Sequence, residues 1–288
     1  MTALLALATS ALWGFADFGG GLLTRRIPAL TVVVVSQTLA VVVLGALVLA
    51  TGGPREADGA LWYAVAAGVV GPVAMLAFYR ALALGPMGVV SPLGSVGVAV
   101  PVGIGLLLGE RPGLLQCAGI GVAVAGVLLA GGPQLRGAPV QRQAIGLTLL
   151  AAVGFGAVMA LIAEASSTLT GLFLALFVQR ITNVATGGAA LWLTVRRGAP
   201  ALPEDGGWTA IRGSLGALAF VGLADVAANG TYALAAQRGP VTVAAVLASL
   251  YPVVTALAAR GVLGERLKWV QTAGAGLALL GTVLLATG

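Results

Sequence analysis

The sequence predicts an all-α integral membrane protein with ten transmembrane helices, arranged as two inverted five-helix repeats. Three observations support this fold class. The 288-residue chain is 59% hydrophobic and only 8% charged, a composition that would leave a soluble protein with large exposed apolar patches. Its apolar stretches have the length of about 20 residues that a helix needs to cross a bilayer. Finally, one segment is present twice, as residues 85–132 and 239–287.

Ten apolar stretches, separated by charged residues, prolines and glycines, define the expected helices. They lack the alternation of an outer-membrane barrel strand. The first stretch is long enough to span a bilayer, so we interpret it as a span and not as a cleaved signal. In chain order the expected spans are residues 3–23, 29–50, 60–82, 87–108, 114–132, 144–163, 170–194, 212–236, 241–263 and 269–287.

The repeat is defined by two motifs that occur in both halves of the chain. Gly85-Pro86 recurs as Gly239-Pro240, 154 residues later. Gly109-Glu110-Arg111 recurs as Gly264-Glu265-Arg266, 155 residues later, and each copy precedes a glycine-rich stretch. The glutamate beside an arginine in each copy predicts a charge pair that fixes the turn. Self-similarity at a nearly constant spacing indicates that the chain is a duplicated unit.

The connector at residues 133–143 is the expected linker between the two units. It separates a first repeat in residues 1–132 from a second repeat in residues 144–288. Because each repeat has five spans, an odd number, the second repeat must cross the membrane in the opposite sense. Inverted repeats of this kind are typical of transporters, whose binding sites lie near the bilayer midplane between the two halves.

The composition argues against several classes of protein. The chain has no histidine and a single cysteine, Cys117, so the usual metal ligands and an intrachain disulfide are missing. We therefore expect no metal and no cofactor. The net charge of +6 is spread over the connectors, which does not fit a nucleic-acid partner. No phosphate-binding Gly-Lys-Ser/Thr loop is present, so ATP would not drive the protein directly.

Polar residues inside the spans are the candidate site. A charge near the bilayer centre costs about 2.5–3.5 kcal/mol, so it needs a partner or a water-filled path. Asp17 lies four residues after Trp13, and Asp225 lies four residues before Asn229. These residues would line a cavity for a polar solute, with an aspartate able to carry a proton. The alternative is helix–helix packing, with Asp225 paired to Arg180. The expected cavity residues are Trp13, Asp17, Gln37, Tyr79, Ser91, Ser95, Gln179, Arg180, Asn183, Asp225, Asn229, Tyr232, Ser249 and Tyr251.

Prolines interrupt the fourth and ninth spans. Proline removes one intrahelical hydrogen bond, which membrane proteins tolerate where protein or water satisfies the freed carbonyl. We expect these spans to bend around the cavity and act as gates, with a simple packing kink as the alternative. The prolines concerned are Pro92, Pro101 and Pro252. The fifth and tenth spans instead carry small residues four positions apart, which predicts a scaffold or a homodimer face.

The order of these motifs resembles the ten-span EamA branch of the drug/metabolite transporter (DMT) superfamily. The resemblance rests on the two halves, on Trp13-Gly14 in the first span, and on the Gly-Pro and Gly-Glu-Arg turns of each half. It implies a multi-pass protein of the plasma or inner membrane, with a cavity lined by spans one to four and six to nine. The family's late proline motif is matched by Leu250-Tyr251-Pro252-Val253, whereas the first half has Val96-Gly97-Val98 there. The two halves are therefore not expected to gate symmetrically.

The function predicted from this reasoning is secondary transport of small organic metabolites or drugs, amino-acid-like or amphipathic, by alternating access. The expected partners are the solute, the lipid bilayer, a coupling proton and a second copy in a homodimer. Two alternatives stay open. An intramembrane enzyme or lipid-handling protein would need a catalytic constellation, which is hard to build without histidine. A non-transporting scaffold would not account for the proline-interrupted spans.

Overall fold

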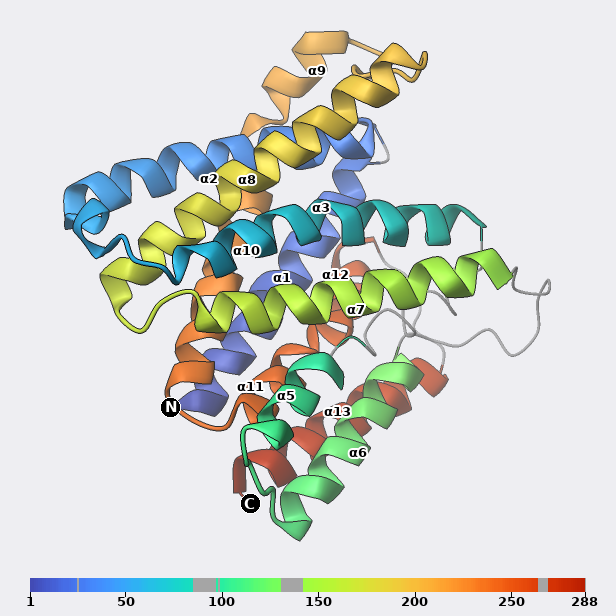
Figure 1. Ribbon diagram of the computed structural model, residues 1–288. Coiled ribbons are helices and arrows are strands. Elements are labelled where there is room, and N and C mark those ends of the chain that lie inside the picture. Colours follow the sequence, from blue (N-terminus) through green and yellow to red (C-terminus); the bar gives the residue numbers. More distant parts are fainter. Residues whose placement is uncertain (25, 85–96, 98, 131–141, 264–268, 288) are drawn as a thin grey trace.

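The computed structural model describes residues 1–24, 26–84, 97, 99–130, 142–263 and 269–287, and within them it is all-helical (Figure 1). The first half contains α1 (Thr2–Thr24), α2 (Ala29–Thr51), the short 3-10 helix η1 (Gly53–Glu56), α3 (Leu61–Leu84), α5 (Ala99–Leu107) and α6 (Leu114–Ala130). The second half contains α7 (Arg142–Glu164), α8 (Leu169–Arg196), α9 (Gly207–Gly213), α10 (Leu215–Gln237), α11 (Val241–Ala248), α12 (Tyr251–Leu263) and α13 (Trp269–Thr287).

Six of the described helices are long and apolar enough to cross a membrane, namely α1, α2, α3, α7, α8 and α10. They coincide with the expected spans one to three and six to eight. The helices at the other four expected spans are shorter or adjoin residues outside the described part of the chain. The described residues therefore support a multi-pass, all-helical protein, and the count of ten spans stays a prediction.

The expected ninth span is divided into two helices, α11 and α12. The break falls at Ser249 and Leu250, and Pro252 is the second residue of α12. Proline is tolerated in the first turn of a helix, where its missing N–H would have had no intrahelical partner. Pro252 therefore starts a helix here, whereas the sequence interpretation placed it inside a continuous bent span. Pro101 lies in the first turn of α5, and Pro92 is outside the described residues.

Pro72 shows how a carbonyl freed by a proline can find a donor on a neighbouring helix. Pro72 lies inside α3 and cannot donate to the carbonyl of Gly68, four residues earlier. The Thr186 hydroxyl of α8 lies 3.1 Å from that carbonyl, within hydrogen-bonding distance, and also 2.8 Å from the Thr182 carbonyl of its own helix. The absence of a side chain on Gly68 lets α8 approach, because a Cβ there would lie 2.5 Å from the carbonyl oxygen of Gln179. The α3–α8 contact thus compensates for the proline.

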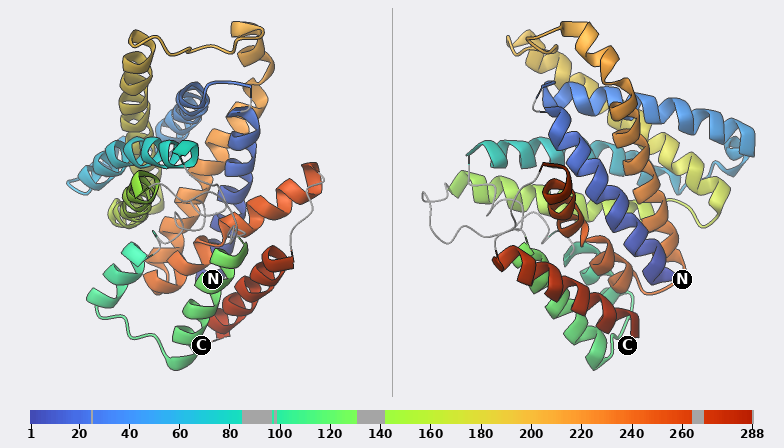
Figure 2. Two further views of the ribbon diagram at one scale, coloured as in Figure 1. Left: turned by 90° about the vertical axis from the view of Figure 1, so that its right-hand side faces the viewer. Right: turned by 180° about the vertical axis from the view of Figure 1, so that it is seen from behind.

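The principal helix pairs all join the two halves of the chain. Helix α1 packs against α10, α3 against α7, α2 against α8, and α6 against α13 (Figures 1 and 2). Exchanging the two repeats converts the α1–α10 pair into the α7–α3 pair and leaves the other two pairs unchanged. This pattern is what two interlocked repeats related by a pseudo-two-fold axis produce.

Small residues of the fifth and tenth expected spans serve this packing within one chain. A Cβ on Gly281 of α13 would lie 2.4 Å from the backbone nitrogen of Ala123 in α6. A Cβ on Gly121 or Gly276 would instead meet no atom of the described residues within 4 Å. The close approach of α6 and α13 therefore depends on Gly281, whereas Gly121 and Gly276 do not contribute to it.

Gly222 of α10 gives a direct test of the helix packing. A Cβ at this position would lie 2.1 Å from the backbone oxygen of Ser36 in α2, so α2 and α10 must separate to accommodate it. We expect Gly222→Ala to lower the free energy of unfolding by about 1–3 kcal/mol, the usual range for overpacking. Gly216→Ala in the same helix is the matched control, because its Cβ would meet nothing within 4 Å. Equal unfolding midpoints for both variants in detergent would contradict the packing described.

Candidate functional site

One carboxylate on α10, that of Asp225, accepts hydrogen bonds from side chains of three other helices. Trp13 of α1 donates its indole N–H to Oδ1 of Asp225 at 3.1 Å. Gln37 of α2 donates to Oδ2 at 3.0 Å, and Arg180 of α8 donates to the same oxygen at 2.7 Å. Two donors therefore come from the first repeat and one comes from the second.

The ion pair between Arg180 and Asp225 is unequally buried. The Arg180 side chain is 2% exposed, whereas that of Asp225 is 26% exposed. Nη1 of Arg180 also donates to Oε1 of Gln37 at 2.7 Å. The buried Nε and Nη2 atoms have no hydrogen-bond partner among the described residues. Because a buried charge requires compensation, this guanidinium depends chiefly on the Asp225 carboxylate.

Asn229 extends the network along α10. Its side-chain amide donates to the backbone carbonyl of Asp225 at 2.8 Å and to Oδ1 at 3.3 Å. Oδ1 of Asn229 is buried and without a hydrogen-bond partner in the described part of the chain, as are Oδ1 of Asn183 and the hydroxyl of Tyr232. We refer to Trp13, Gln37, Arg180, Asp225 and Asn229 together as the Asp225 cluster.

Two tyrosines flank the indole of Trp13. The ring of Tyr232 in α10 lies 6.2 Å away in a tilted arrangement, and the ring of Tyr251 in α12 lies 6.1 Å away, edge-on. Gly14 permits this geometry, because a Cβ there would lie 2.5 Å from Cβ of Val254. The Trp13-Gly14 pair thus combines an inward-facing indole with a surface on which α12 can pack closely.

Asp17 lies one turn beyond Trp13 on the same helix. Asp17 is exposed in the structure and lies within electrostatic range of Asp225 and Tyr251. Because Trp13 points toward Asp225 and residues four apart share a helix face, Asp17 lies on the side of α1 that faces the Asp225 cluster. No cation or hydrogen-bond donor among the described residues pairs with it. The two aspartates therefore differ: Asp225 is paired, whereas Asp17 has no partner in the part of the chain that the structure describes.

The structure groups most of the described candidate residues and separates others. The five members of the Asp225 cluster, Tyr232 and Tyr251 form one assembly, with Asp17 beside it. The Ser249 hydroxyl instead donates to the Val246 carbonyl of its own helix at 2.7 Å. Gln179 is 2% exposed at the α3–α8 contact. The side chains of Tyr79 and Pro252, together with Ser91, Ser95 and Pro92, lie outside the described residues.

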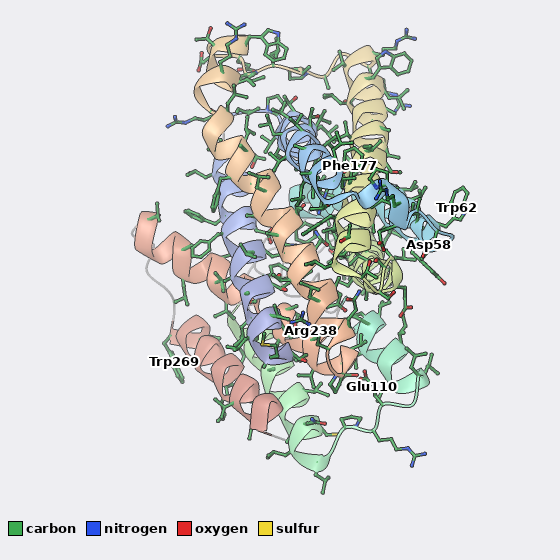
Figure 3. The ribbon with its side chains drawn as sticks, turned by 90° about the vertical axis from the view of Figure 1, so that its left-hand side faces the viewer. Asp58, Trp62, Glu110, Phe177, Arg238 and Trp269 are labelled. Carbon is green, nitrogen blue, oxygen red and sulfur yellow. The ribbon has the colours of Figure 1, made fainter. Side chains whose placement is uncertain are left out.

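Glu110 has a role that the sequence interpretation did not give it. Its position beside Arg111 predicted a charge pair that fixes a turn. The structure instead has its carboxylate accepting the backbone N–H groups of Val241 and Thr242, the latter at 3.0 Å. These are the first residues of α11, whose N–H groups have no intrahelical acceptor. Figure 3 places Glu110 at the end of the molecule where α10 finishes, near Arg238.

Comparison with known proteins agrees with this architecture. The sequence matches the model of the EamA-like transporter family over residues 1–132 and again over residues 142–287. A solved crystal structure, described only as that of a protein, has the same fold with a TM-score of 0.77. The match covers 99% of this chain and 96% of that one at 19% identity, so it shows the fold alone. No curated protein matches the sequence significantly.

The family match extends over both halves of the chain, in the same two segments that carry the repeated motifs. Members of this family are membrane transporters of the DMT superfamily and not enzymes. The described helices independently contain six segments that can cross a bilayer. The chain is therefore a multi-pass membrane protein that belongs to the EamA-like transporter family.

Proposed function

We propose that the protein is a secondary transporter that moves small organic metabolites or drugs across the plasma or inner membrane by alternating access. The observation that carries this proposal is the Asp225 cluster. It is a buried polar network in the membrane-spanning part of the protein, and its hydrogen bonds join α1 and α2 to α8 and α10. Polar groups at such depth are costly and mark solute or ion pathways.

The position of the cluster between the repeats supports alternating access. Transporters of this architecture move one repeat against the other around a central site. Such a movement must stretch or exchange the bonds from Trp13 and Gln37 to Asp225, because donor and acceptor belong to different repeats. A solute that forms hydrogen bonds with these groups in only one conformational state would shift the equilibrium toward that state, because a ligand shifts an equilibrium only when it binds the two states with different affinities.

Flux measurements separate this function from its alternatives. A thermal-shift screen of the purified protein against amino acids, nucleosides, sugars and cationic drugs would identify ligands. The ligands would then be tested for movement into proteoliposomes, with protein-free liposomes as the control. Saturable flux is the expected result. Binding without flux would indicate a receptor or scaffold, and product formation without flux would indicate an enzyme or lipid-handling protein.

A proton is the proposed coupling ion, and Asp17 is the better of the two candidate carriers. Asp225 is held by Arg180 at 2.7 Å, whereas Asp17 is accessible and unpaired among the described residues. We expect Asp17→Asn to abolish solute accumulation driven by a pH gradient while downhill flux, measured at saturating solute concentration, persists. Asp58→Asn is the control, since Asp58 is exposed in the connector before α3 (Figure 3). Full pH-driven accumulation in both Asp17→Asn and Asp225→Asn would exclude proton coupling through these groups.

The homodimer is also a proposal. A Cβ on Gly121 of α6 or on Gly276 of α13 would meet no atom of the described residues within 4 Å. Both helices also expose large apolar side chains such as Leu114 and Trp269. Small residues at a lipid-facing surface favour close helix association. Light scattering of the detergent-purified protein would give the oligomeric state.

A further inference from the structure

Among the residues that the structure describes, the charges around the Asp225 cluster do not balance. Arg180 and Asp225 form an ion pair and cancel one another. Asp17 adds a second carboxylate within electrostatic range of Asp225, and no arginine or lysine of the described residues bonds to it. When ionised, the described residues of the site therefore have one negative charge in excess, and that charge lies on the exposed Asp17.

Two aromatic rings lie close to Asp17. Trp13 lies one turn before Asp17, on the same face of α1. Tyr251 lies edge-on to Trp13 at 6.1 Å and within electrostatic range of Asp17. The negative faces of such rings attract ammonium groups, most strongly where water is excluded. A carboxylate beside two aromatic rings thus favours a cation, and the rings also provide a surface for an apolar body.

An anionic solute finds no comparable group among the described residues of the site. Their one cation is Arg180, whose side chain is 2% exposed. Its Nη1 is occupied by Gln37 and Asp225, and its Nε and Nη2 atoms are buried away from the surface. A solute carboxylate would have to displace Asp225 to reach the guanidinium, and it would then be repelled by both aspartates.

We propose that the solute of this transporter is an organic cation with an apolar or aromatic body, whose charged nitrogen binds Asp17 while Trp13 and Tyr251 contact its body. This inference rests on the proposed transport function and specifies its solute class. The tyrosine and tryptophan rings select the body, and the unpaired carboxylate selects the charge. Asp225 is reserved for Arg180 and acts as a positioning residue through its bond to the Trp13 indole.

A series of compounds with one aromatic body and different charges tests the proposal. Phenethylammonium, 2-phenylethanol, 3-phenylpropionate and phenylalanine share a phenyl ring on a short chain and are cationic, neutral, anionic and zwitterionic, respectively. Dissociation constants at pH 7 would be measured from tryptophan fluorescence of the purified protein. We expect phenethylammonium to bind at least about tenfold more tightly than 2-phenylethanol, since tenfold corresponds to about 1.4 kcal/mol.

Variants assign this preference to particular residues. Asp17→Asn should reduce the ratio of the two dissociation constants to about one, the value expected when the charge contributes nothing. Asp58→Asn should leave it unchanged, and Asp17→Glu should largely restore it. Tyr251→Leu should weaken binding of every compound with an aromatic body, whereas Tyr251→Phe should retain it because the ring face is kept.

Several outcomes would overturn the inference. Tightest binding of 3-phenylpropionate or phenylalanine would indicate a carboxylate site at Arg180. A cation preference that persists in Asp17→Asn would place the charge recognition elsewhere. If Asp17→Asn does not fold, the wild-type series decides alone, because equal affinities for phenethylammonium and 2-phenylethanol already contradict the proposal.

Flux of the same four compounds separates this inference from the proposed function. Cation binding through Asp17 without flux of any compound would support the site and contradict transport. Saturable flux of the neutral or zwitterionic compound, without binding of the cation, would support transport and overturn the cation site.

Discussion

Replacement of Asp225 by asparagine is expected to lower the free energy of unfolding by about 3–5 kcal/mol, the usual cost of leaving one partner of a buried ion pair without the other. The partner that remains is Arg180, which is 2% exposed and already lacks partners for Nε and Nη2 among the described residues. Chemical unfolding in detergent, followed by tryptophan fluorescence, would measure this loss.

Substitution of the other member of the ion pair should lower the free energy of unfolding by less. Arg180→Gln leaves a carboxylate that is 26% exposed and still accepts hydrogen bonds from Trp13, Gln37 and Asn229. We expect a loss of about 2–3 kcal/mol, at the lower end for a charge deprived of its partner. An equal or larger loss for Arg180→Gln than for Asp225→Asn would contradict the burial assigned to the two groups.

The double variant Arg180→Met/Asp225→Leu separates stability from function. Apolar replacement of both members of a buried ion pair is often neutral or stabilising, so the unfolding free energy should return to within about 1–2 kcal/mol of the wild type. Flux in proteoliposomes should nevertheless be lost, because the Trp13 indole and the Gln37 amide lose their common acceptor. Wild-type flux in a stable double variant would exclude the Asp225 cluster from the transport pathway.

The ends of most helices could be predicted because local chemistry marks them. The second expected span, residues 29–50, corresponds to α2 at Ala29–Thr51, which Pro28 precedes and Gly52 terminates in a left-handed conformation. The ninth span was predicted less well. Pro252 is compatible both with a kink inside a helix and with the start of a new one. Only tertiary contacts decide between the two, and the sequence does not contain them in a local form.

The members of the site could be predicted but not their partners. Buried polar residues are conspicuous in an apolar span because of their cost, which is how Asp17, Asp225 and Arg180 were identified. The donors to Asp225 come from residues up to 212 positions away, so no local pattern could show that one aspartate is paired and the other free. The Arg180–Asp225 ion pair was predicted only as the alternative to a solute cavity. Because the exposed Asp17 lies beside this pair, helix–helix pairing and solute binding can both occur at one site.

Glu110 shows how a local pattern can mislead. The adjacent arginine indicated a charge pair, whereas the acceptor role of the carboxylate depends on Val241 and Thr242, more than 130 residues away. Both turns had been recognised as repeated motifs, the Gly-Glu-Arg turn at Glu110 and the Gly-Pro turn at Pro240. What sequence alone did not reveal is that the motif of one half binds the motif of the other.

The contact between Glu110 and the start of α11 predicts a second large loss of stability. Glu110→Ala should lower the free energy of unfolding by about 1.5–3 kcal/mol, because hydrogen bonds to a charged group contribute that much and two backbone donors are left without an acceptor. Glu56→Ala is the matched control. Glu56 is an exposed glutamate that accepts one bond from Thr168 at 2.8 Å, and loss of an exposed interaction should cost less than about 1 kcal/mol.

Hydrogen exchange would locate the effect of Glu110→Ala. Peptides that cover the start of α11 should exchange faster in the variant, while peptides from α2 and α8 keep their wild-type protection. A uniform increase over all helices would mean general destabilisation and not a lost helix cap. Glutamine should restore little of the protection, since its amide presents one acceptor oxygen and one N–H group to two N–H donors.

The same substitution should also slow transport in protein that remains folded. Glu110 of the first repeat holds the N-terminus of α11, and α11 leads directly into the break before Tyr251. Tyr232 is within electrostatic range of Glu110, and its ring lies 6.2 Å from that of Trp13, which in turn donates to Asp225. Loss of the cap should therefore weaken the packing of α11 against the first repeat, which contributes the Trp13 indole. Glu110→Ala should change flux more than Gly281→Ala of comparable stability, because Gly281 packs α13 against Ala123 of α6 and contacts no member of the Asp225 cluster.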